Sequence, residues 1–267
     1  MDSVIIAYRN LLNQKMDIRP FIENRRIVWT MTTSAYKYYT MNLRKWLQQV
    51  ALVPWVLCII CCDQDSYVFF RREGIPCVRY KDPAVKRAGQ VGLAPFGSNE
   101  FKIWNRIKVD LLKWFCVQPD LDWSLYLDGD IVVQRDPWPE LIGLQGNLFF
   151  QCDCGHGEHH TAPCKTICSG VIATRHVSPS QSTLYDFDQA LWKECLEQDQ
   201  PYIAKRLEIT NTPFETLARP LFGNGHWQQK GPWKEHEWVL LHYNYRTGDN
   251  KKVAMRAAGH WLLIGAS

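Results

Sequence analysis

The chain has 267 residues, of which 46% are hydrophobic and 13% aromatic, and this is enough for one large buried core. The formal net charge is only +4, with both signs mixed along the chain, which argues against the concentrated basic face of a nucleic-acid-binding protein. No apolar run has the length of a transmembrane helix or the layout of a signal peptide, so we expect a cytoplasmic protein without a membrane span.

The first half of the sequence alternates between strand and helix patterns. A polar turn at Thr32 and Thr33 separates the first strand from a helix that carries apolar residues at helical spacing. The predicted elements are, in chain order, strand 26–31, a helix through Tyr36, Leu43 and Trp46, strand 55–62, helix 66–72, strand 76–80, loop 82–98, helix 99–115, strand 123–127 and strand 131–133.

The second half is less regular. It contains predicted strands at 148–151 and 170–174 and a predicted helix at 183–197, and its last third is rich in Trp, Gly and Pro. The alternation in the first half predicts an α/β fold with a mostly parallel sheet, helices on both of its faces and an irregular, loop-rich C-terminal part. Ligands of such sheets bind at the carboxyl ends of the strands.

One acidic motif lies at such a strand end. Asp128 and Asp130 flank Gly129, directly after the apolar run 123–127. Two neighbouring carboxylates repel each other and lose solvation, and a hard divalent cation offsets that cost while also binding phosphate oxygens. Gly129 lets a ligand approach the backbone closely. An ordinary acidic turn is the alternative, but the apolar strand before the motif makes a metal site the better interpretation.

With this motif the sequence resembles the nucleotide-diphospho-sugar transferases of the GT-A fold, whose signature is Asp-x-Asp after a hydrophobic strand. The resemblance extends over residues 26–261 and is nearest to plant-like and algal or viral members. It implies a Rossmann-like GT-A domain over 1–267, with a nucleotide-binding half at 1–150 and an acceptor-binding half at 151–267. It also implies a UDP-sugar donor, a Mn²⁺ or Mg²⁺ ion and a glycan acceptor. A virus-encoded member would work in the host-cell cytoplasm.

Several residues of the first half take their roles from this resemblance. Thr32 and Thr33, with Asn42 further on, match the first nucleotide-contacting loop of the family. Asp63 matches an acidic residue near the nucleoside, and Lys108 a lysine that approaches the donor. Taken alone, Asp63 would be interpreted as a strand-end cap and Lys108 as a solvated helix residue.

Two further motifs match the sugar pocket. Cys168-Ser169-Gly170 resembles an Asn-Ser-Gly strand that lines this pocket, with Cys168 in place of the usual asparagine. Asp199 and Gln200 resemble an Asp-Gln pair whose aspartate faces the transferred sugar, which makes Asp199 the candidate catalytic residue. It would act as a general base in an inverting reaction or as electrostatic support in a retaining one.

The last motif lies near the C-terminus. His242 and Asn244, followed by Gly248, resemble an element in which the histidine is the third metal ligand, beside Asp128 and Asp130. The following Lys251 or Lys252 would contact the diphosphate; the spacing leaves both open, and we favour Lys252. Chain order supports the whole set, because each motif alone also has an ordinary structural explanation.

A second cluster combines thiols and imidazoles in one short stretch. Four cysteines and three histidines could hold zinc, but the spacing C-x-C-x9-C-x3-C lacks the paired C-x-x-C of familiar zinc modules. We therefore favour unlinked thiols, with a zinc site or a disulfide as alternatives. The residues are Cys152, Cys154, Cys164, Cys168, His156, His159 and His160.

Aromatic residues of the tail could stack on the apolar faces of acceptor sugars, or they could fill a core. The best acceptor-loop candidate is 223–227. The residues in question are Phe222, His226, Trp227, Trp233, Trp238 and Trp261.

The leading interpretation is a metal-dependent glycosyltransferase, with xylose, galactose and glucose as the first donor sugars to test. A sugar nucleotidyltransferase is one alternative, but the turn at Thr32 lacks the glycine-rich, basic loop that binds a triphosphate. A non-catalytic zinc- or sugar-binding module built on residues 150–170 is another, and it would leave the ordered acidic and basic motifs unexplained.

Overall fold

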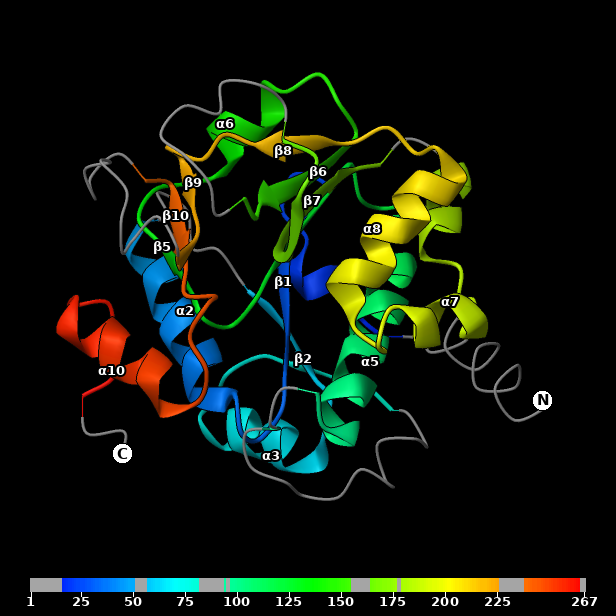
Figure 1. Cartoon of the computed structure of the whole chain (residues 1–267). Coiled ribbons are helices and arrows are strands. Elements are labelled where there is room, and N and C mark those ends of the chain that lie inside the picture. The colour runs from blue at the N-terminus through cyan, green and yellow to red at the C-terminus, as the bar shows by residue number, and fades with distance from the viewer. Residues whose placement is uncertain are drawn as a thin grey trace.

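The computed structural model describes residues 16–50, 57–81, 94, 97–154, 164–176, 179–225 and 238–264 (Figure 1). The strands of this part are β1 Arg26–Thr32, β2 Cys58–Cys61, β3 Val78–Arg79, β4 Trp123–Leu127, β5 Ile131–Val133, β6 Leu148–Cys152, β7 Ile167–Arg175, β8 Glu215–Leu217, β9 Phe222–Gly223 and β10 Leu240–His242. Its helices are η1 Arg19–Phe21, α2 Lys37–Val50, α3 Gln64–Arg72, α5 Asn99–Cys116, α6 Trp138–Ile142, η2 Pro179–Tyr185, α7 Gln189–Glu194, α8 Asp199–Thr210 and α10 Asp249–Ala257.

Seven strands form the main sheet in the order β3-β2-β1-β4-β7-β6-β8. Only β7 runs antiparallel to its neighbours, β4 and β6. The sheet is therefore mostly parallel, as the sequence predicts. Strands on both sides of residue 150 belong to it, and the division of the chain into two halves at that residue stays a prediction.

Helices cover both faces of this sheet (Figure 1). Successive side chains of a strand point to opposite faces, and β1 shows both surroundings. Ile27 and Trp29 belong to the hydrophobic cluster that includes α5, α7 and α8, whereas Val28 packs with the cluster that includes α2 and α3. The continuous apolar character of β1 follows from this burial on both sides.

The chain order reverses in the middle of the sheet. From β1 the chain moves outward through β2 to β3, and β4 then pairs with β1 on its other side. Ligands of open α/β sheets bind at the carboxyl ends of the strands at such a switch point. The segments that follow β1 and β4, at Thr33 and Asp128, lie there.

Most predicted elements of the first half are confirmed, including the helix 99–115, which the structure has as α5. The loop 82–98 falls almost wholly outside the described residues. The single helix predicted at 183–197 is wrong: Asp188 caps α7, whose end is followed by two residues with positive φ, Leu196 and Glu197. A separate helix, α8, then begins at Asp199.

The tail is more ordered than the sequence suggests. Besides loops it contains α10 and a second sheet, in which β10 pairs antiparallel with β5 and parallel with β9. These strands are only two or three residues long, too short to leave a periodic pattern. Among the described residues, no helix has both the length and the apolar character needed to cross a membrane.

Candidate active site

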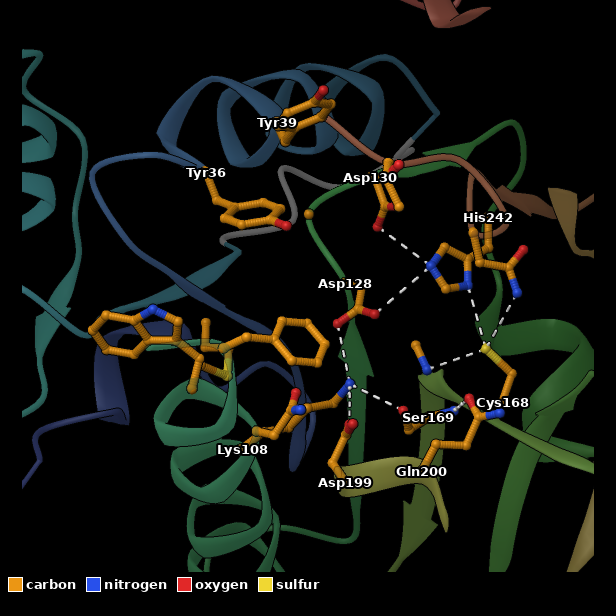
Figure 2. A pocket seen from close by; sticks show the side chains of 18 of the residues that line it. Tyr36, Tyr39, Lys108, Asp128, Asp130, Cys168, Ser169, Asp199, Gln200 and His242 are labelled. Carbon is orange, nitrogen blue, oxygen red and sulfur yellow. Dashed lines mark hydrogen bonds and ion pairs between the residues drawn. The ribbon is translucent and has the colours of Figure 1, made fainter. Parts of the chain in front are cut away.

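The acidic motif and His242 meet through strand pairing. Asp128 follows β4, and Asp130 directly precedes β5. The antiparallel register of β5 and β10 places His242 opposite Ile131 and therefore beside Asp130. The Nε2 atom of His242 lies 3.3 Å from Oδ1 of Asp130 and 3.7 Å from Oδ2 of Asp128 (Figure 2). One ligand atom of each residue lies within 4.8 Å of the others, so the three side chains can hold one metal ion.

Gly170 makes room for this cluster. A Cβ atom at this position would lie 2.1 Å from Cε1 of His242 and 2.9 Å from Oδ2 of Asp128. The backbone N–H of Asp128 also donates a hydrogen bond of 2.8 Å to the carbonyl oxygen of Gly170. The glycine of the Ser-Gly motif is thus required because the acid and the imidazole approach the β7 backbone so closely.

Gln151, at the end of β6, orients His242. Its Nε2 donates hydrogen bonds to the carbonyl oxygens of Phe222 and Gly223, which fixes the amide. The Oε1 atom therefore faces Nδ1 of His242 at 2.9 Å and accepts a hydrogen bond from its N–H. With Nδ1 holding a proton, Nε2 is the nitrogen that can bind a cation.

Two lysines reach the acidic groups. Nζ of Lys251, in α10, lies 2.5 Å from Oδ2 of Asp130. Nζ of Lys108, in α5, lies 2.9 Å from Oδ2 of Asp199 and 3.2 Å from Oδ1 of Asp128, between these two acids (Figure 2). Both lysines are largely buried, so the ion pairs lie in surroundings that screen charge weakly.

The side chains hold one another in their charged forms. Burial alone would lower the pKa of His242, but the Asp130 carboxylate and the Cys168 thiol raise it from 6.5 to about 10. Burial would raise the pKa of Asp130, but the charges of Lys251 and His242 hold it well below its usual range. The ion pairs thus join Asp128 and Asp199 to Lys108, and Asp130 to Lys251 and His242.

A second polar network links β6, β7 and α8. The backbone N–H of Ser169 donates to Oε1 of Gln200 at 3.2 Å, and Nε2 of Gln200 donates to Oδ2 of Asp153 at 2.9 Å. Asp153 also accepts hydrogen bonds of 3.0 Å from Nδ2 of Asn244 and from the hydroxyl of Tyr245. Asp153 thus connects the Asp-Gln motif to the segment after His242.

Apart from the buried Gln151, the side chains described above border one cavity of about 760 Å³. Aromatic side chains form another part of its wall. Tyr36, just before α2, projects toward the side of Asp128 and Asp130 (Figure 2), and the hydroxyl of Tyr39, within α2, donates to the carbonyl oxygen of Gly248 at 3.3 Å. The predicted site residues that line the cavity are Thr32, Thr33, Lys108, Asp128, Gly129, Asp130, Ser169, Gly170, Asp199, Gln200, His242, Asn244, Gly248 and Lys251.

Three residues singled out from the sequence lie elsewhere. Asp63 caps α3 and accepts hydrogen bonds of 2.7 Å from the backbone N–H groups of Ser66 and Ser34. Asn42 is buried and bonds the backbone of the tail. Nζ of Lys252 lies 5.1 Å from the ring centroid of Trp261, so Lys251, and not the favoured Lys252, is the lysine at the acidic cluster.

The residues of the aromatic and cysteine predictions also lie in different places. Phe222 and Trp238 are buried in hydrophobic clusters, and Trp261 packs edge-on against Tyr39. Of the cysteines, Cys168 faces His242, with Sγ 3.5 Å from Nδ1. The residues of these two predictions that lie outside the described part are His156, His159, His160, His226, Trp227 and Trp233.

Sequence reasoning missed Gln151, Asp153 and the two tyrosines. Gln151 stands in an apolar strand, and a buried amide there was a usable signal of a polar partner. Asp153 stands between Cys152 and Cys154, where the sequence gives it no signal of its own. Tyr36 and Tyr39 fit an amphipathic helix pattern, which cannot separate residues that face a core from residues that face a cavity.

The solved structures named here, which share this fold, are glycosyltransferases. The chain matches a galactosyltransferase, LgtC, in complex with donor and acceptor sugar analogues (TM-score 0.55, 13% identity, 90% of this chain and 97% of that one). It also matches mouse xyloside xylosyltransferase 1 (TM-score 0.54, 13% identity, 83% of this chain and 98% of that one). A third match is a glycosyltransferase involved in glycosylation of the major capsid of PBCV-1 (TM-score 0.51, 12% identity, 87% of this chain and 98% of that one). At these identities the likeness concerns the fold.

The family follows from the sequence itself. The family model of nucleotide-diphospho-sugar transferases matches residues 56–255, and the chain belongs to this family. It is therefore a nucleotide-sugar glycosyltransferase. A comparison with curated protein sequences found no match.

Proposed function

We propose that the protein transfers a sugar from a UDP-sugar to a hydroxyl group of a glycan, with a divalent cation held by Asp128, Asp130 and His242. The observation that carries this proposal is the convergence of these three side chains at the wall of the cavity, next to Lys251 and Lys108. A nucleoside diphosphate is a polyanion, and this wall combines a candidate cation site with two ammonium groups.

The donor atoms fit a hard divalent cation such as Mn²⁺ or Mg²⁺. Two carboxylates and one imidazole nitrogen suit Mn²⁺, and carboxylates suit Mg²⁺. Gly170 supports the fit, because any larger residue would fill the space beside His242 and Asp128. A bound ion would act as a Lewis acid that stabilises the negative charge of the departing diphosphate.

Lys251 is the residue we assign to the diphosphate. In the ligand-free structure its ammonium pairs with Asp130, and a cation bound to Asp130 would compete for that carboxylate. The ammonium could then pair with a phosphate oxygen at the same wall of the cavity. Thr32, Thr33, Tyr36 and Tyr39, which line another part of the cavity, are the groups we assign to the nucleoside.

Asp199 and Lys108 are assigned to the transferred sugar. Asp199 opens α8, where the helix dipole favours a carboxylate, and Lys108 holds it toward Asp128. During transfer the acceptor oxygen bonds to the anomeric carbon, the bond from that carbon to the phosphate oxygen breaks, and the acceptor hydroxyl loses its proton. Asp199 takes this proton in an inverting reaction. In a retaining one the departing phosphate oxygen takes the proton, and Asp199 stabilises positive charge on the sugar ring. The anomeric configuration of the product, read by NMR, distinguishes the two.

The test is release of UDP from UDP-xylose, UDP-galactose and UDP-glucose, with and without a glycan acceptor. We expect release from one of these donors with Mn²⁺ or Mg²⁺, abolished by a chelator and by Asp128→Asn. Release that persists with a chelator would overturn the metal assignment. Incorporation of label from a nucleoside triphosphate and a sugar phosphate would indicate a nucleotidyltransferase instead, and sugar binding without turnover would indicate a binding module.

A further inference from the structure

A group of three cysteines lies next to the active site but outside the chemistry proposed for it. Cys152 ends β6, Cys154 follows two residues later, and Cys164 stands three residues before β7. Their Sγ atoms lie within 4.8 Å of one another. All three are free thiols, and Cys168, the fourth cysteine of this stretch, faces His242 instead.

The end of β6 separates this group from the site of Asp128 and Asp130. Gln151 bonds His242, and Asp153 lines the cavity. Because successive side chains along a strand point to opposite faces, Cys152 between them points away from that cavity. The three thiols thus form a cluster of their own on the other side of the strand.

Two of the hydrogen bonds around the cluster suit thiolates. The side chain of Arg219 is buried beside it, and its Nε donates to Sγ of Cys152 at 3.0 Å. The backbone N–H of Thr166 donates to Sγ of Cys164 at 3.4 Å. In both bonds the sulfur is the acceptor, the role that an ionised sulfur fills better than a neutral thiol.

We propose that Cys152, Cys154 and Cys164 bind a zinc ion, with Arg219 as the group that balances its charge. Three thiolates and Zn²⁺ together carry one negative charge, which the guanidinium neutralises in this buried position. Zn–S bonds of about 2.3 Å place tetrahedral thiolate sulfurs about 3.8 Å apart, so only small movements are needed to close the site. The fourth coordination position belongs to water or to another ligand.

Such an ion would stabilise the active site from the side of β6 that faces away from the cavity. Cys152 and Cys154 are the chain neighbours of Asp153, the residue that holds Gln200, Asn244 and Tyr245. The backbone N–H of Asp153 also donates to the carbonyl oxygen of Thr166, close to Cys164. A metal that joins the three cysteines would therefore hold both chain neighbours of Asp153 and so fix its backbone.

A disulfide explains the cluster less well. It joins two sulfurs and leaves the third as a thiol, and neutral disulfide sulfurs would not balance the buried guanidinium. Cys154 and Cys164 are only partly buried, which gives an ion a way in from solvent.

The experiment uses the full chain, reduced, freed of metal and titrated with Zn²⁺ against a chromophoric chelator under anaerobic conditions. Cd²⁺ then replaces Zn²⁺, so that the ultraviolet thiolate-to-metal charge-transfer band reports sulfur ligation. Alkylation of the thiols with and without Zn²⁺, mapped by mass spectrometry, identifies the ligands. Cys154→Ser and Cys164→Ser are the test variants, and Cys195→Ser, a partly buried cysteine in α7's C-terminal cap, is the matched control.

We expect one thiolate-bound ion per chain, and protection of Cys152, Cys154 and Cys164 from alkylation. Both test variants should weaken binding about 100-fold or more, and Arg219→Met about 10- to 100-fold. The Cys195→Ser variant should bind like the unchanged protein. No charge-transfer band, or equal affinity in Cys154→Ser and Cys195→Ser, would overturn the proposal. If the test variants fail to fold, the alkylation map of the unchanged protein still decides.

Discussion

Nδ1 of His242 lies 2.9 Å from Oε1 of Gln151, and this contact sets which nitrogen of the imidazole can bind a cation. The amide of Gln151 cannot turn over without losing its bonds to Phe222 and Gly223. The chain therefore prepares Nε2 of His242 as a ligand before any ion arrives. Metal-binding histidines in general donate their other ring N–H to such an acceptor, which orients the ring.

Replacing Gln151 with methionine tests this role. The variant keeps the volume of the side chain but removes the acceptor for Nδ1, so we expect Mn²⁺ affinity to fall about 10- to 100-fold. Isothermal titration with Mn²⁺ measures it. Gln48→Met, on the exposed side of α2, is the control and should bind Mn²⁺ normally. Unchanged affinity in Gln151→Met would mean that the contact does not orient the histidine.

Gly170→Ala should disable the metal site through sterics alone. The new Cβ would need His242 to move by an ångström or more, and displacements of that size cost about 100-fold in activity. Gly143→Ala is the matched control, because its Cβ would meet nothing nearer than the carbonyl oxygen of Pro139 at 3.9 Å. Donor turnover of the two variants, measured side by side, checks this. Near-normal turnover of Gly170→Ala would contradict the close approach of His242 and Asp128 to Gly170.

Adjacent lysines provide an internal comparison. Lys251→Met should raise the KM for the donor about 10- to 100-fold, because it removes one charge-assisted hydrogen bond to the diphosphate. Lys252→Met, whose native ammonium lies over Trp261, should leave the KM within about twofold of the unchanged protein, because this ammonium does not line the cavity. A larger effect for Lys252→Met than for Lys251→Met would restore the assignment that sequence spacing favours.

Metal binding should release a proton from His242. Because the raised pKa of about 10 keeps this imidazole protonated at neutral pH in the metal-free protein, an ion must displace that proton. Metal affinity should therefore rise with pH up to about 10. Calorimetry in buffers of different ionisation enthalpy should give release of about one proton per Mn²⁺ at pH 7. The His242→Asn variant should release none, and release that persists there would assign the proton to another group.

The sequence predicts the fold and much of the site because the relevant signals are local. Apolar runs followed by polar turns place Thr32 and Asp128 at strand ends, and strand ends of a parallel sheet share one edge. The resemblance to the nucleotide-diphospho-sugar transferases then supplies Lys108, Ser169, Asp199 and His242, all of which line the cavity.

The sequence does not show how helices are rotated about their axes or how distant strands are placed relative to one another. Lys251 and Lys252 are neighbours in the chain, and only the orientation of α10 decides which of them faces Asp130. The partnership of Gln151 with His242 joins residues 91 positions apart through two different sheets. No local pattern encodes such a contact, because it depends on how β6 and β10 are placed by the rest of the fold.

The most direct test of the metal-dependent donor site is thermal stability with UDP, GDP and CDP, each with and without Mn²⁺, for the unchanged protein and for Asp128→Asn. A ligand that binds only the folded state raises the melting temperature, by an amount that grows with its affinity. We predict stabilisation by UDP that requires Mn²⁺ and is lost in Asp128→Asn. Equal stabilisation by UDP without the ion, or no stabilisation by any of the three nucleotides, would contradict the metal-dependent donor site.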